Sequence, residues 1–459
     1  MKNMTFNPEI QYRCTIIRGK SISRMEDYLP VYAQILNEIC PIPADKFDKT
    51  FDDKLSRFIK DDGKTIKNHR TENVDKLLGM YFEKDGIIYI SERTKRFLEN
   101  NDQPAFFKSA CYKFQQPNGS QKILTTKEKI KNGINFKPYH FILSLLKVAA
   151  DKKTILTKDE VAYYVLNALQ VLQGKITVDE VFKTILERRE KKIYKKVETP
   201  GKAYSYSLQH INEQFDYLEL ANLIRKDAKN IWLNAKEVAS TELFLKDLAN
   251  PLAIDYTKYN LSKKDIGKKI EHEWREYYGA TTETEAEKFE TTIESLETIP
   301  PTEVSRISLM ELGDEGENFV LKIEKERVKV FNPRLVNKVN HHGKTKGLGY
   351  DVTSIEADRN KKNPEFTRYI EVKSTKRIHP PDFTDTVDSI TLTRNEWVAA
   401  EQHSNSFYIY RLYFTTKGIF LSVIKDPVKK NNDGILYATP IAYRIEFGDK
   451  AVDEKQTFV

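Results

Sequence analysis

The segment Arg368–Thr375, with the sequence RYIEVKST, most constrains how the last third of the chain can fold. Side chains of a strand alternate between its two faces, so Ile370 and Val372 point one way while Glu371 and Lys373 point the other. The apolar face needs a core to cover it, whereas the other face carries a carboxylate and an ammonium group. The pattern predicts a strand of a sheet with one face in the core and one face available for chemistry.

A second β-like run begins at Asp351, and the polar stretch after it is typical of a hairpin tip. Pairing of the two strands would bring Asp351 close to Glu371. Mg²⁺ prefers oxygen ligands and keeps several waters, so one or two carboxylates and a substrate phosphate can hold it. We therefore expect Asp351, Glu371 and the carbonyl of Val372 to bind Mg²⁺. Lys373 would orient a water and stabilise developing negative charge, as in a metal-dependent phosphodiesterase.

The upstream segment Met310–Val328 has apolar residues at nearly helical spacing and carries Glu317 among them. A helix here could bring Glu317 to the same site as a further catalytic group.

Three other groups of polar residues in this region have simpler interpretations. His341 and His342 have no cysteine or acidic partner at zinc spacing, although a role facing a groove stays open. The expectations are a solvated helix face for Glu324 and Glu326, a loop for His341 and His342, and a capping or orienting role at a helix start for Asn395 and Glu396.

The order of a glutamate on a helix, Gly-Tyr-Asp before one strand and Glu-x-Lys on the next resembles the PD-(D/E)XK nuclease fold. Gly349 and Tyr350 stand where the family name has proline. The order, and the later run TLTRNEWVAAEQHSNSFYIYRLY, resemble the archaeal Holliday-junction-resolvase branch of that fold. The resemblance implies an α/β domain with a central mixed sheet and Mg²⁺-dependent cutting that leaves a 5′-phosphate and a 3′-hydroxyl.

Composition is compatible with a polyanionic partner, because 75 Lys and Arg residues against 67 Asp and Glu residues give a net charge of +8. The three cysteines are widely spaced, which argues against a disulfide framework and a structural zinc site and for a reducing compartment. The start lacks the apolar region of a signal peptide, and no apolar stretch is long enough to span a bilayer. We expect a soluble, cytoplasmic protein with no membrane partner.

The chain before the candidate nuclease has two halves with a similar pattern. In the first, helical periodicity at Met25–Cys40 and Asn68–Tyr81 precedes two short strands around Lys84-Asp85-Gly86. In the second, several helices and a further helix from Ser205 precede two strands near residues 223–233. Helices followed by a β-hairpin are typical of a winged helix. We therefore predict two winged-helix subdomains.

The last helix of a winged helix can lie in the major groove, where Asn, Gln and Arg match base edges. The N-terminal segment, with basic residues around Ile16 and Ile17, has two interpretations: an arm that contacts phosphates or a groove, or a strand packed on the first half with its basic ends in water. Winged helices also serve as protein-interaction modules, and polar residues on an exposed helix are usually solvated. The DNA-contact candidates are Arg13, Arg18 and Lys20 in the N-terminal segment, His69, Arg70, Asn73 and Lys76 in the first half, and Gln209, His210 and Asn212 in the second.

The stretch Thr281–Pro301 is rich in threonine and glutamate, is weakly apolar and ends in two prolines. It therefore predicts an exposed connection between domains. The expected organisation is a multidomain α+β chain: winged-helix subdomains at residues 1–132 and 133–262, a linker at 263–303 and a PD-(D/E)XK domain at 304–459.

The segments QPAFFKSACYKFQQPNG and AYYVLNALQVLQGKI, with the N-terminal segment and the Tyr-Ser-x-Gln-His-Ile run, resemble the recognition domain of bipartite Type IIS restriction endonucleases. That resemblance implies recognition of a short asymmetric site in double-stranded DNA by two winged helices, and cutting at a distance by a separate nuclease domain. It also implies a protein that is monomeric when free and forms a transient homodimer for double-strand cleavage. Two rivals stay open: a modification-dependent or structure-selective nuclease, and a DNA-binding regulator with an inactive nuclease fold.

Overall fold

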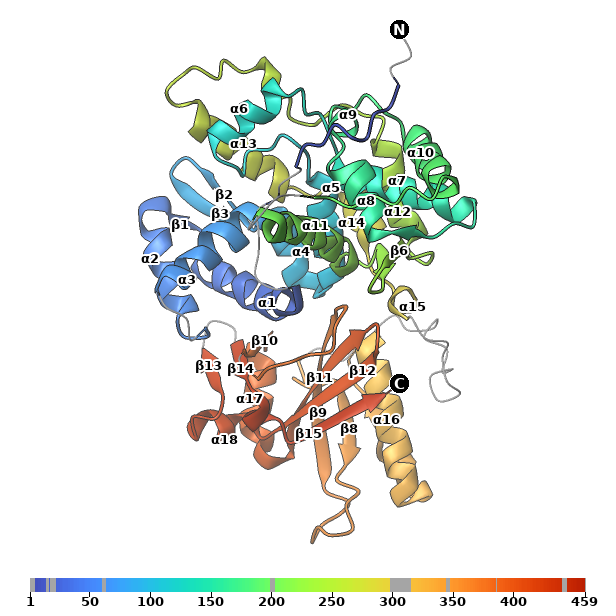
Figure 1. Cartoon of the computed structure of the whole chain (residues 1–459). Helices are drawn as coiled ribbons and strands as arrows, with labels where there is room; N and C mark the ends of the chain where they lie inside the picture. Colours follow the sequence, from blue (N-terminus) through green and yellow to red (C-terminus); the bar gives the residue numbers. More distant parts are fainter. Residues whose placement is uncertain are drawn as a thin grey trace. The chain divides into compact units, whose positions relative to one another are not determined.

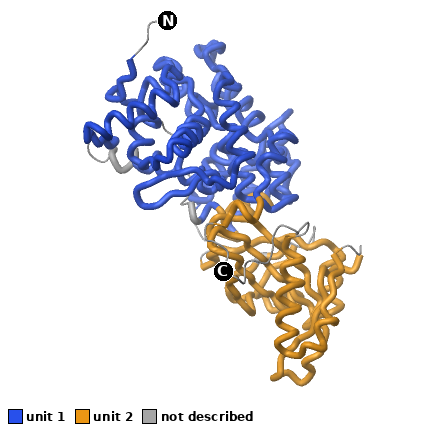
Figure 2. The backbone as a smooth tube through the Cα atoms, turned by 90° about the vertical axis from the view of Figure 1, so that its right-hand side faces the viewer, with its two compact units in different colours: residues 1–25, 35–56, 60–291 blue, residues 26–34, 57–59, 292–459 orange. Residues whose placement is uncertain are grey.

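The structure is a computed structural model that falls into two compact units (Figure 2). The first unit comprises residues 1–25, 35–56 and 60–291, and the second comprises residues 26–34, 57–59 and 292–459. The residues that the structure describes are 5–13, 16, 22–59, 63–198, 203–297, 315–343, 347–384, 386–439 and 444–458.

The first unit contains two three-stranded sheets that share one strand order. They are β1 (Ile42–Pro43), β3 (Ile87–Ile90) and β2 (Tyr81–Lys84), and β4 (Leu156–Thr157), β6 (Asn230–Leu233) and β5 (Ile224–Lys226). In each sheet the first strand along the chain pairs with the last, and the last two form an antiparallel hairpin. The two predicted hairpins are confirmed.

Helices surround these sheets (Figure 1). In each half of the unit the chain forms a helix, a short strand, further helices and then the β-hairpin. The predicted helix at Asn68–Tyr81 is only partly right, because it is replaced by α3 and the π-helix η1 and ends before β2. Among the residues that the structure describes, no helix is long and apolar enough to cross a bilayer. The helices up to residue 289 are α1 (Ile22–Ile39), α2 (Ala44–Leu55), α3 (Gly63–Asn68), η1 (His69–Leu77), α4 (Glu92–Asn100), α5 (Gln103–Lys113), α6 (Ile123–Lys131), α7 (Pro138–Asp151), α8 (Lys158–Val161), η2 (Ala162–Leu166), α9 (Leu169–Leu172), α10 (Val178–Glu190), α11 (Ala203–Leu220), α12 (Val238–Asp247), η3 (Tyr256–Lys258), α13 (Ile266–Gly279) and α14 (Glu283–Phe289).

The predicted exposed connection is wrong for residues 281–291, which fold onto the first unit. Glu285 of α14 forms an ion pair with Lys113 at 2.6 Å, and each side chain is only 10% exposed. Phe289 is 1% exposed, and the Thr291 N–H donates to Asp102 at 2.7 Å. The glutamates of a Thr/Glu-rich segment are thus used for capping and for buried pairing. Residues 298–303 of the predicted linker, and the first residues of the predicted nuclease domain up to 314, lie outside the described part of the chain.

The second unit is built around a six-stranded mixed sheet in the order β15-β12-β11-β9-β8-β7. The pair β9–β11 is parallel, and the other neighbours are antiparallel. The second unit also contains a separate three-stranded sheet with the order β10-β14-β13. The elements are α15 (Ile293–Leu296), α16 (Glu315–Phe331), η5 (Pro333–Lys338), β7 (Asn340–His341), β8 (Val352–Ile355), β9 (Thr367–Lys376), β10 (Asp388–Thr391), α17 (Arg394–His403), η6 (Ser404–Ser406), β11 (Phe407–Thr415), β12 (Gly418–Lys425), α18 (Pro427–Asn432), β13 (Tyr437–Thr439), β14 (Arg444–Phe447), η7 (Asp449–Ala451) and β15 (Glu454–Phe458).

Helices α16 and α17 cover opposite faces of this sheet. On β11, Ile409 belongs with Trp397 of α17 to one buried apolar cluster, whereas the next residue, Tyr410, donates to Glu324 of α16 at 2.8 Å. Consecutive strand residues face opposite sides, so the two helices lie on different faces. In the parallel register Ile409 is level with Glu371. The polar face of β9 is therefore the face that α17 covers.

The prediction that Glu324 lies on a solvated helix face is wrong. Its side chain is 2% exposed and forms an ion pair with Arg327 at 2.5 Å. Burial would raise the pKa of Glu324, but its charged and hydrogen-bonding partners, Arg327 first among them, outweigh burial and lower that pKa. Glu326, at 61% exposure, does lie in solvent. Because α16 is fixed by a buried polar network and by apolar packing, its first turn is held against the sheet.

Candidate functional site

Asp351 stands immediately before β8 and joins that strand to β9. Its N–H donates to the Ile370 carbonyl at 2.9 Å, and its carboxylate accepts from the Val372 N–H at 2.8 Å. The N–H and C=O of one strand residue point to the same side. The carbonyl of Val372 therefore faces the same edge of β9 as the Asp351 carboxylate, as the predicted ligand set requires.

Gly349 lets the loop before Asp351 approach α17 closely. Its φ is +76°, and a Cβ there would lie 2.4 Å from the Asn395 carbonyl oxygen and 2.8 Å from the Ala399 Cβ. Any other residue would push the loop away from the helix. The glycine at this place is explained by close packing that fixes the start of β8.

Glu371 and Lys373 lie on the same face of β9, as the alternation predicts. The Lys373 Nζ is 2.7 Å from Glu371 Oε1 and 2.9 Å from Glu396 Oε2 at the start of α17. The side chains of Glu371, Glu396 and Lys373 are 4%, 15% and 23% exposed, respectively. Two carboxylates from different elements thus contact one ammonium group.

The site contains several carboxylates that are largely buried and lie close to one another. Burial, together with the charges of Glu317 and Glu396, raises the pKa of Asp351 to about 6. Burial and the neighbouring Asp351 and Glu396 raise the pKa of Glu371 well above its ordinary value, although Lys373 opposes the shift. Burial would lower the pKa of Lys373, but Glu371 and Glu396 outweigh it and raise that pKa. One ammonium group does not balance these carboxylates, so the site suits an added cation.

The donor set fits Mg²⁺ in the manner typical of that ion. In the part of the chain that the structure describes, no three His, Cys, Asp or Glu side chains form a preformed metal-binding group. Mg²⁺ does not need such a cage, because it keeps waters and takes one or two carboxylates plus substrate phosphate oxygens. Asp351, Glu371 and the Val372 carbonyl offer hard oxygen donors at one edge of β9.

Glu317 reaches the neighbourhood of the site from the first turn of α16, where Gly316 packs closely on Ser374 of β9. Its Oε2 is 2.6 Å from the Nε2 of His341. A Cβ on Gly343 would lie 1.9 Å from the same Oε2, so the turn after β7 closes directly over the Glu317 carboxylate. The predicted loop position of His341 is wrong: it belongs to β7 and partners Glu317.

His341 and Glu396 are the two site residues that sequence reasoning did not select as candidates. Glu396 forms the predicted capping box with Thr393, which is confirmed, but it also contacts Lys373. The sequence feature that points to this contact is the position of Glu396 on the first helix after the Glu-x-Lys strand. His342, next to His341, is bound to Thr353 at 2.9 Å.

The DNA-contact residues predicted in the first half are mostly buried, which contradicts their predicted availability. His69, Arg70 and Asn73 are 0%, 6% and 2% exposed, and Arg70 is paired with Asp48 and Asp52. They belong to η1, whose wider π-helical turns face them inward. Of this group the side chain of Lys76 is partly exposed, at 30%, and it pairs with Glu72.

The candidates of the second half lie on α11 and divide between its two faces. Gln209 and Asn212, three residues apart, are exposed on one face. His210 is 1% exposed, and its Nδ1 accepts a hydrogen bond from the Ile16 N–H at 3.3 Å. His210 therefore anchors the N-terminal segment and is not available to bases, contrary to the prediction.

The N-terminal segment packs on the second half, not on the first as one interpretation had it. The Tyr12 N–H donates to the Asn167 carbonyl at 2.7 Å, and the Leu169 N–H donates to the Ile10 carbonyl at 2.9 Å. Arg13 lies in this segment within the described residues, whereas Arg18 and Lys20 lie outside them. This places the one described basic candidate of the segment on the same subdomain as α11.

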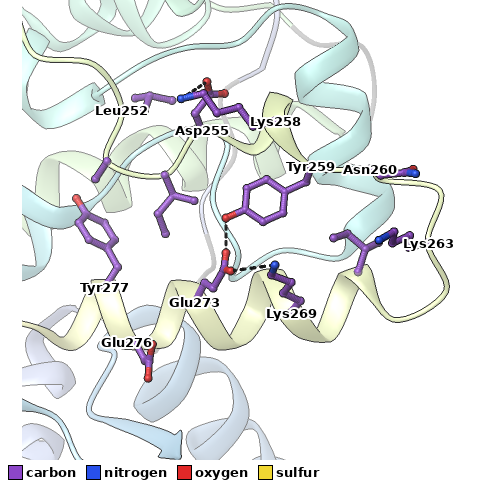
Figure 3. A pocket seen from close by; sticks show the side chains of 13 residues that line it. Leu252, Asp255, Lys258, Tyr259, Asn260, Lys263, Lys269, Glu273, Glu276 and Tyr277 are labelled. Carbon is purple, nitrogen blue, oxygen red and sulfur yellow. Dashed lines mark hydrogen bonds and ion pairs between the residues drawn. The ribbon is translucent and has the colours of Figure 1, made fainter.

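A cavity of about 800 Å³ lies beside α13 in the first unit (Figure 3). Lysines line it, but carboxylates of the same lining neutralise them: Lys258 is 3.6 Å from Asp255, and Lys269 is 3.7 Å from Glu273. Tyr259 also donates to Glu273. The balanced charge does not favour a polyanion here.

Comparison with known proteins finds a similarity in each part of the chain. Residues 316–422 match the family described as Protein NO VEIN, C-terminal. A solved structure titled "Crystal structure of pyrene- and phenanthrene-modified DNA in complex with the BpuJ1 endonuclease binding domain" is 44% identical, with a TM-score of 0.58. The match covers 60% of this chain and 100% of that one.

The search of curated proteins found no match. Residues 6–275 match the family described as Restriction endonuclease BpuJI, N terminal. This match spans more than half of the 459 residues. The chain belongs to the BpuJI N-terminal restriction endonuclease family.

Proposed function

We propose that this protein is a Type IIS restriction endonuclease that binds a short asymmetric site in double-stranded DNA and hydrolyses phosphodiester bonds nearby with Mg²⁺. The observation that carries the proposal is the meeting of Asp351, Glu371 and Lys373 at one edge of β9, in a chain whose first unit belongs to a restriction-endonuclease family. A relative of that unit was crystallised with modified DNA.

The fold supports the proposal in both units. Two successive sets of helix, short strand, helices and hairpin, with one strand order, are what two winged-helix subdomains require. The chain order α16, β8, β9, α17 and β11 is the order expected of a PD-(D/E)XK domain, and it supports the proposed roles of Glu317, Asp351 and Glu371-x-Lys373. For DNA contact, exposed Gln209 and Asn212 of α11 are the candidates whose amides match adenine edges.

In the proposed mechanism, Asp351, Glu371 and the Val372 carbonyl would hold Mg²⁺. When bound, the ion would make a coordinated water more acidic and offset charge on the scissile phosphate. Lys373 orients the attacking water and stabilises the negative charge that develops on the phosphate oxygens. Glu317, which is paired with His341, would support the ion or its water. In-line attack breaks the bond from phosphorus to the 3′ oxygen and leaves a 5′-phosphate and a 3′-hydroxyl.

The test is to incubate the protein with a random-sequence DNA pool, with and without Mg²⁺, and to sequence the ends produced. Ends at a fixed offset from one asymmetric motif would support the proposal. Cuts that need Mg²⁺ but share no motif would favour a modification-dependent or structure-selective nuclease, and an enriched motif without cuts would favour a regulator. Asp351→Ala and Lys373→Ala should each lower cleavage at least about 100-fold and leave binding nearly unchanged.

A further inference from the structure

Lys373 lies between two carboxylates that come from different parts of the fold. Its Nζ is 2.7 Å from Glu371 on its own strand and 2.9 Å from Glu396 on α17. Neither carboxylate is freely solvated, since their side chains are 4% and 15% exposed. The ammonium group is therefore held at the crossing of β9 and the start of α17.

Glu396 is rigidly placed for this contact. Its Oε2 accepts the Thr393 N–H at 2.9 Å, and its own N–H donates to the Thr393 hydroxyl at 3.3 Å, which completes a capping box. Trp397 and Ala400 bury the next turn of α17 in the core. The carboxylate that meets Lys373 thus cannot move without disturbing the helix start.

A cap alone does not account for this arrangement. The first turn of a helix carries a partial positive charge and disfavours a nearby cation. Lys373 nevertheless places its ammonium group there, and the same Oε2 that caps the helix also contacts it. Glu396 makes an otherwise unfavourable position favourable for the lysine.

We propose that Glu396 is the positioning residue for Lys373, holding its ammonium group at the reaction centre independently of Glu371. The proposal rests on the proposed nuclease function, in which Glu371 is also a metal ligand. A carboxylate committed to a divalent cation has less charge to offer a lysine, whereas Glu396 has no place in the ligand set. The second anchor keeps Lys373 beside the attacking water throughout.

A stability cycle without metal tests the pair separately from activity. The melting temperatures of Glu396→Gln, Lys373→Met and the double variant are compared with wild type in the presence of a chelator. Gln keeps the capping box, because Glu and Gln serve equally there. The double variant should lose less than the sum of the two single losses, since contacting residues are coupled. Strict additivity would overturn the proposal.

Single-turnover cleavage at saturating protein tests the role in the reaction. Glu396→Gln should lower the rate by about 10- to 100-fold, as expected for a lost charged partner of a reacting group, with unchanged DNA affinity. Glu396→Asp, which keeps the charge, should recover part of the rate. Thr393→Ala weakens the cap but keeps the carboxylate, and Glu401→Gln removes a charge from the same helix, so both should cut at nearly the wild-type rate.

A wild-type rate in Glu396→Gln, or an equal loss in Thr393→Ala, would overturn the proposal. A wild-type protein that does not cut at all would instead overturn the proposed function and, with it, the catalytic role of Glu396. In that case the stability cycle would still show the coupled pair. The two failures therefore give different results.

Discussion

Four carboxylates, Glu317, Asp351, Glu371 and Glu396, surround the single ammonium group of Lys373 at the candidate site, so its stability depends on their charge. Burial raises the pKa of Asp351 to about 6, whereas in the unfolded chain its pKa is about 3.9. The contribution of this group to stability is therefore full below about pH 4 and is lost as the pH rises through 6. At pH 8 the raised pKa of Asp351 lowers the free energy of unfolding by roughly 3 kcal/mol.

Asp351→Asn should accordingly increase the free energy of unfolding when no metal is present, and more so at pH 8 than at pH 5. Urea unfolding of the two proteins with a chelator at both pH values measures this. Added Mg²⁺ should stabilise wild type and not the variant, because a ligand that binds only the folded state raises stability. An equal effect of the substitution at both pH values would contradict the prediction.

Gly343 offers a test of Glu317 that leaves Glu317 itself unchanged. A Cβ at Gly343 would come within 1.9 Å of Glu317 Oε2 and 2.9 Å of His341 Nε2. A terminal carboxylate can turn away at little cost in stability, but it would then lose His341. Gly343→Ala should therefore lower cleavage by about 10-fold or more while the melting temperature changes little.

Gly448→Ala is the matched control for that substitution, since a Cβ at Gly448 meets nothing within 4 Å. It should cut like wild type. If Gly343→Ala also cut like wild type, Glu317 would have no role that depends on its present position.

At the scale of single residues, the sequence predicts only the part of the site that lies on consecutive elements. The strand alternation places Glu371 and Lys373 on one face, and hairpin pairing brings Asp351 beside them. His341 could not be found in this way, because β7 has only two residues and its partner Glu317 is 24 positions away on a helix. The second contact of Glu396 depends on the docking of α17, which a capping pattern does not reveal.

Among the elements, α11 and η1 show why helical periodicity alone does not identify a DNA-reading face. Both segments carry Asn, Gln, His or Arg residues, but η1 buries its set and α11 exposes Gln209 and Asn212. The π-helical turn of η1 changes which side chains face the core, and composition does not predict such a turn. The Thr/Glu-rich segment at 281–291 is a similar case, since its burial depends on the distant Lys113.

Gln209→Ala and Asn212→Ala should each weaken binding to the recognised site by about 10- to 100-fold, because a good amide contact to a base is worth ~1–3 kcal/mol. Binding to unrelated DNA should change little. Asn73→Ala, in contrast, should lower the free energy of unfolding by about 1–3 kcal/mol, because it removes a polar side chain from the buried interior. Fluorescence anisotropy with specific and scrambled duplexes, together with thermal melts, separates the two effects.

A purely sequence-independent loss in the α11 variants would contradict the assignment of α11 as the reading helix. Loss of specific binding in Asn73→Ala without loss of stability would restore η1 as a candidate.

At the scale of the whole molecule, one chain carries one set of Asp351, Glu371 and Lys373, whereas a double-strand break requires two hydrolyses on strands of opposite direction. We therefore expect a second copy to supply the second site. On DNA with a single recognition site, the initial rate of double-strand cleavage should rise more than linearly with protein concentration. A strictly linear rise would contradict dimerisation.

Mixing experiments sharpen this prediction. Excess Lys373→Ala protein added to a fixed amount of wild type would occupy the second position without cutting, since the substitution leaves the first unit unchanged. The fraction of nicked product should then rise at the expense of linear product. An unchanged ratio of nicked to linear DNA would mean that one nuclease domain cuts both strands in succession.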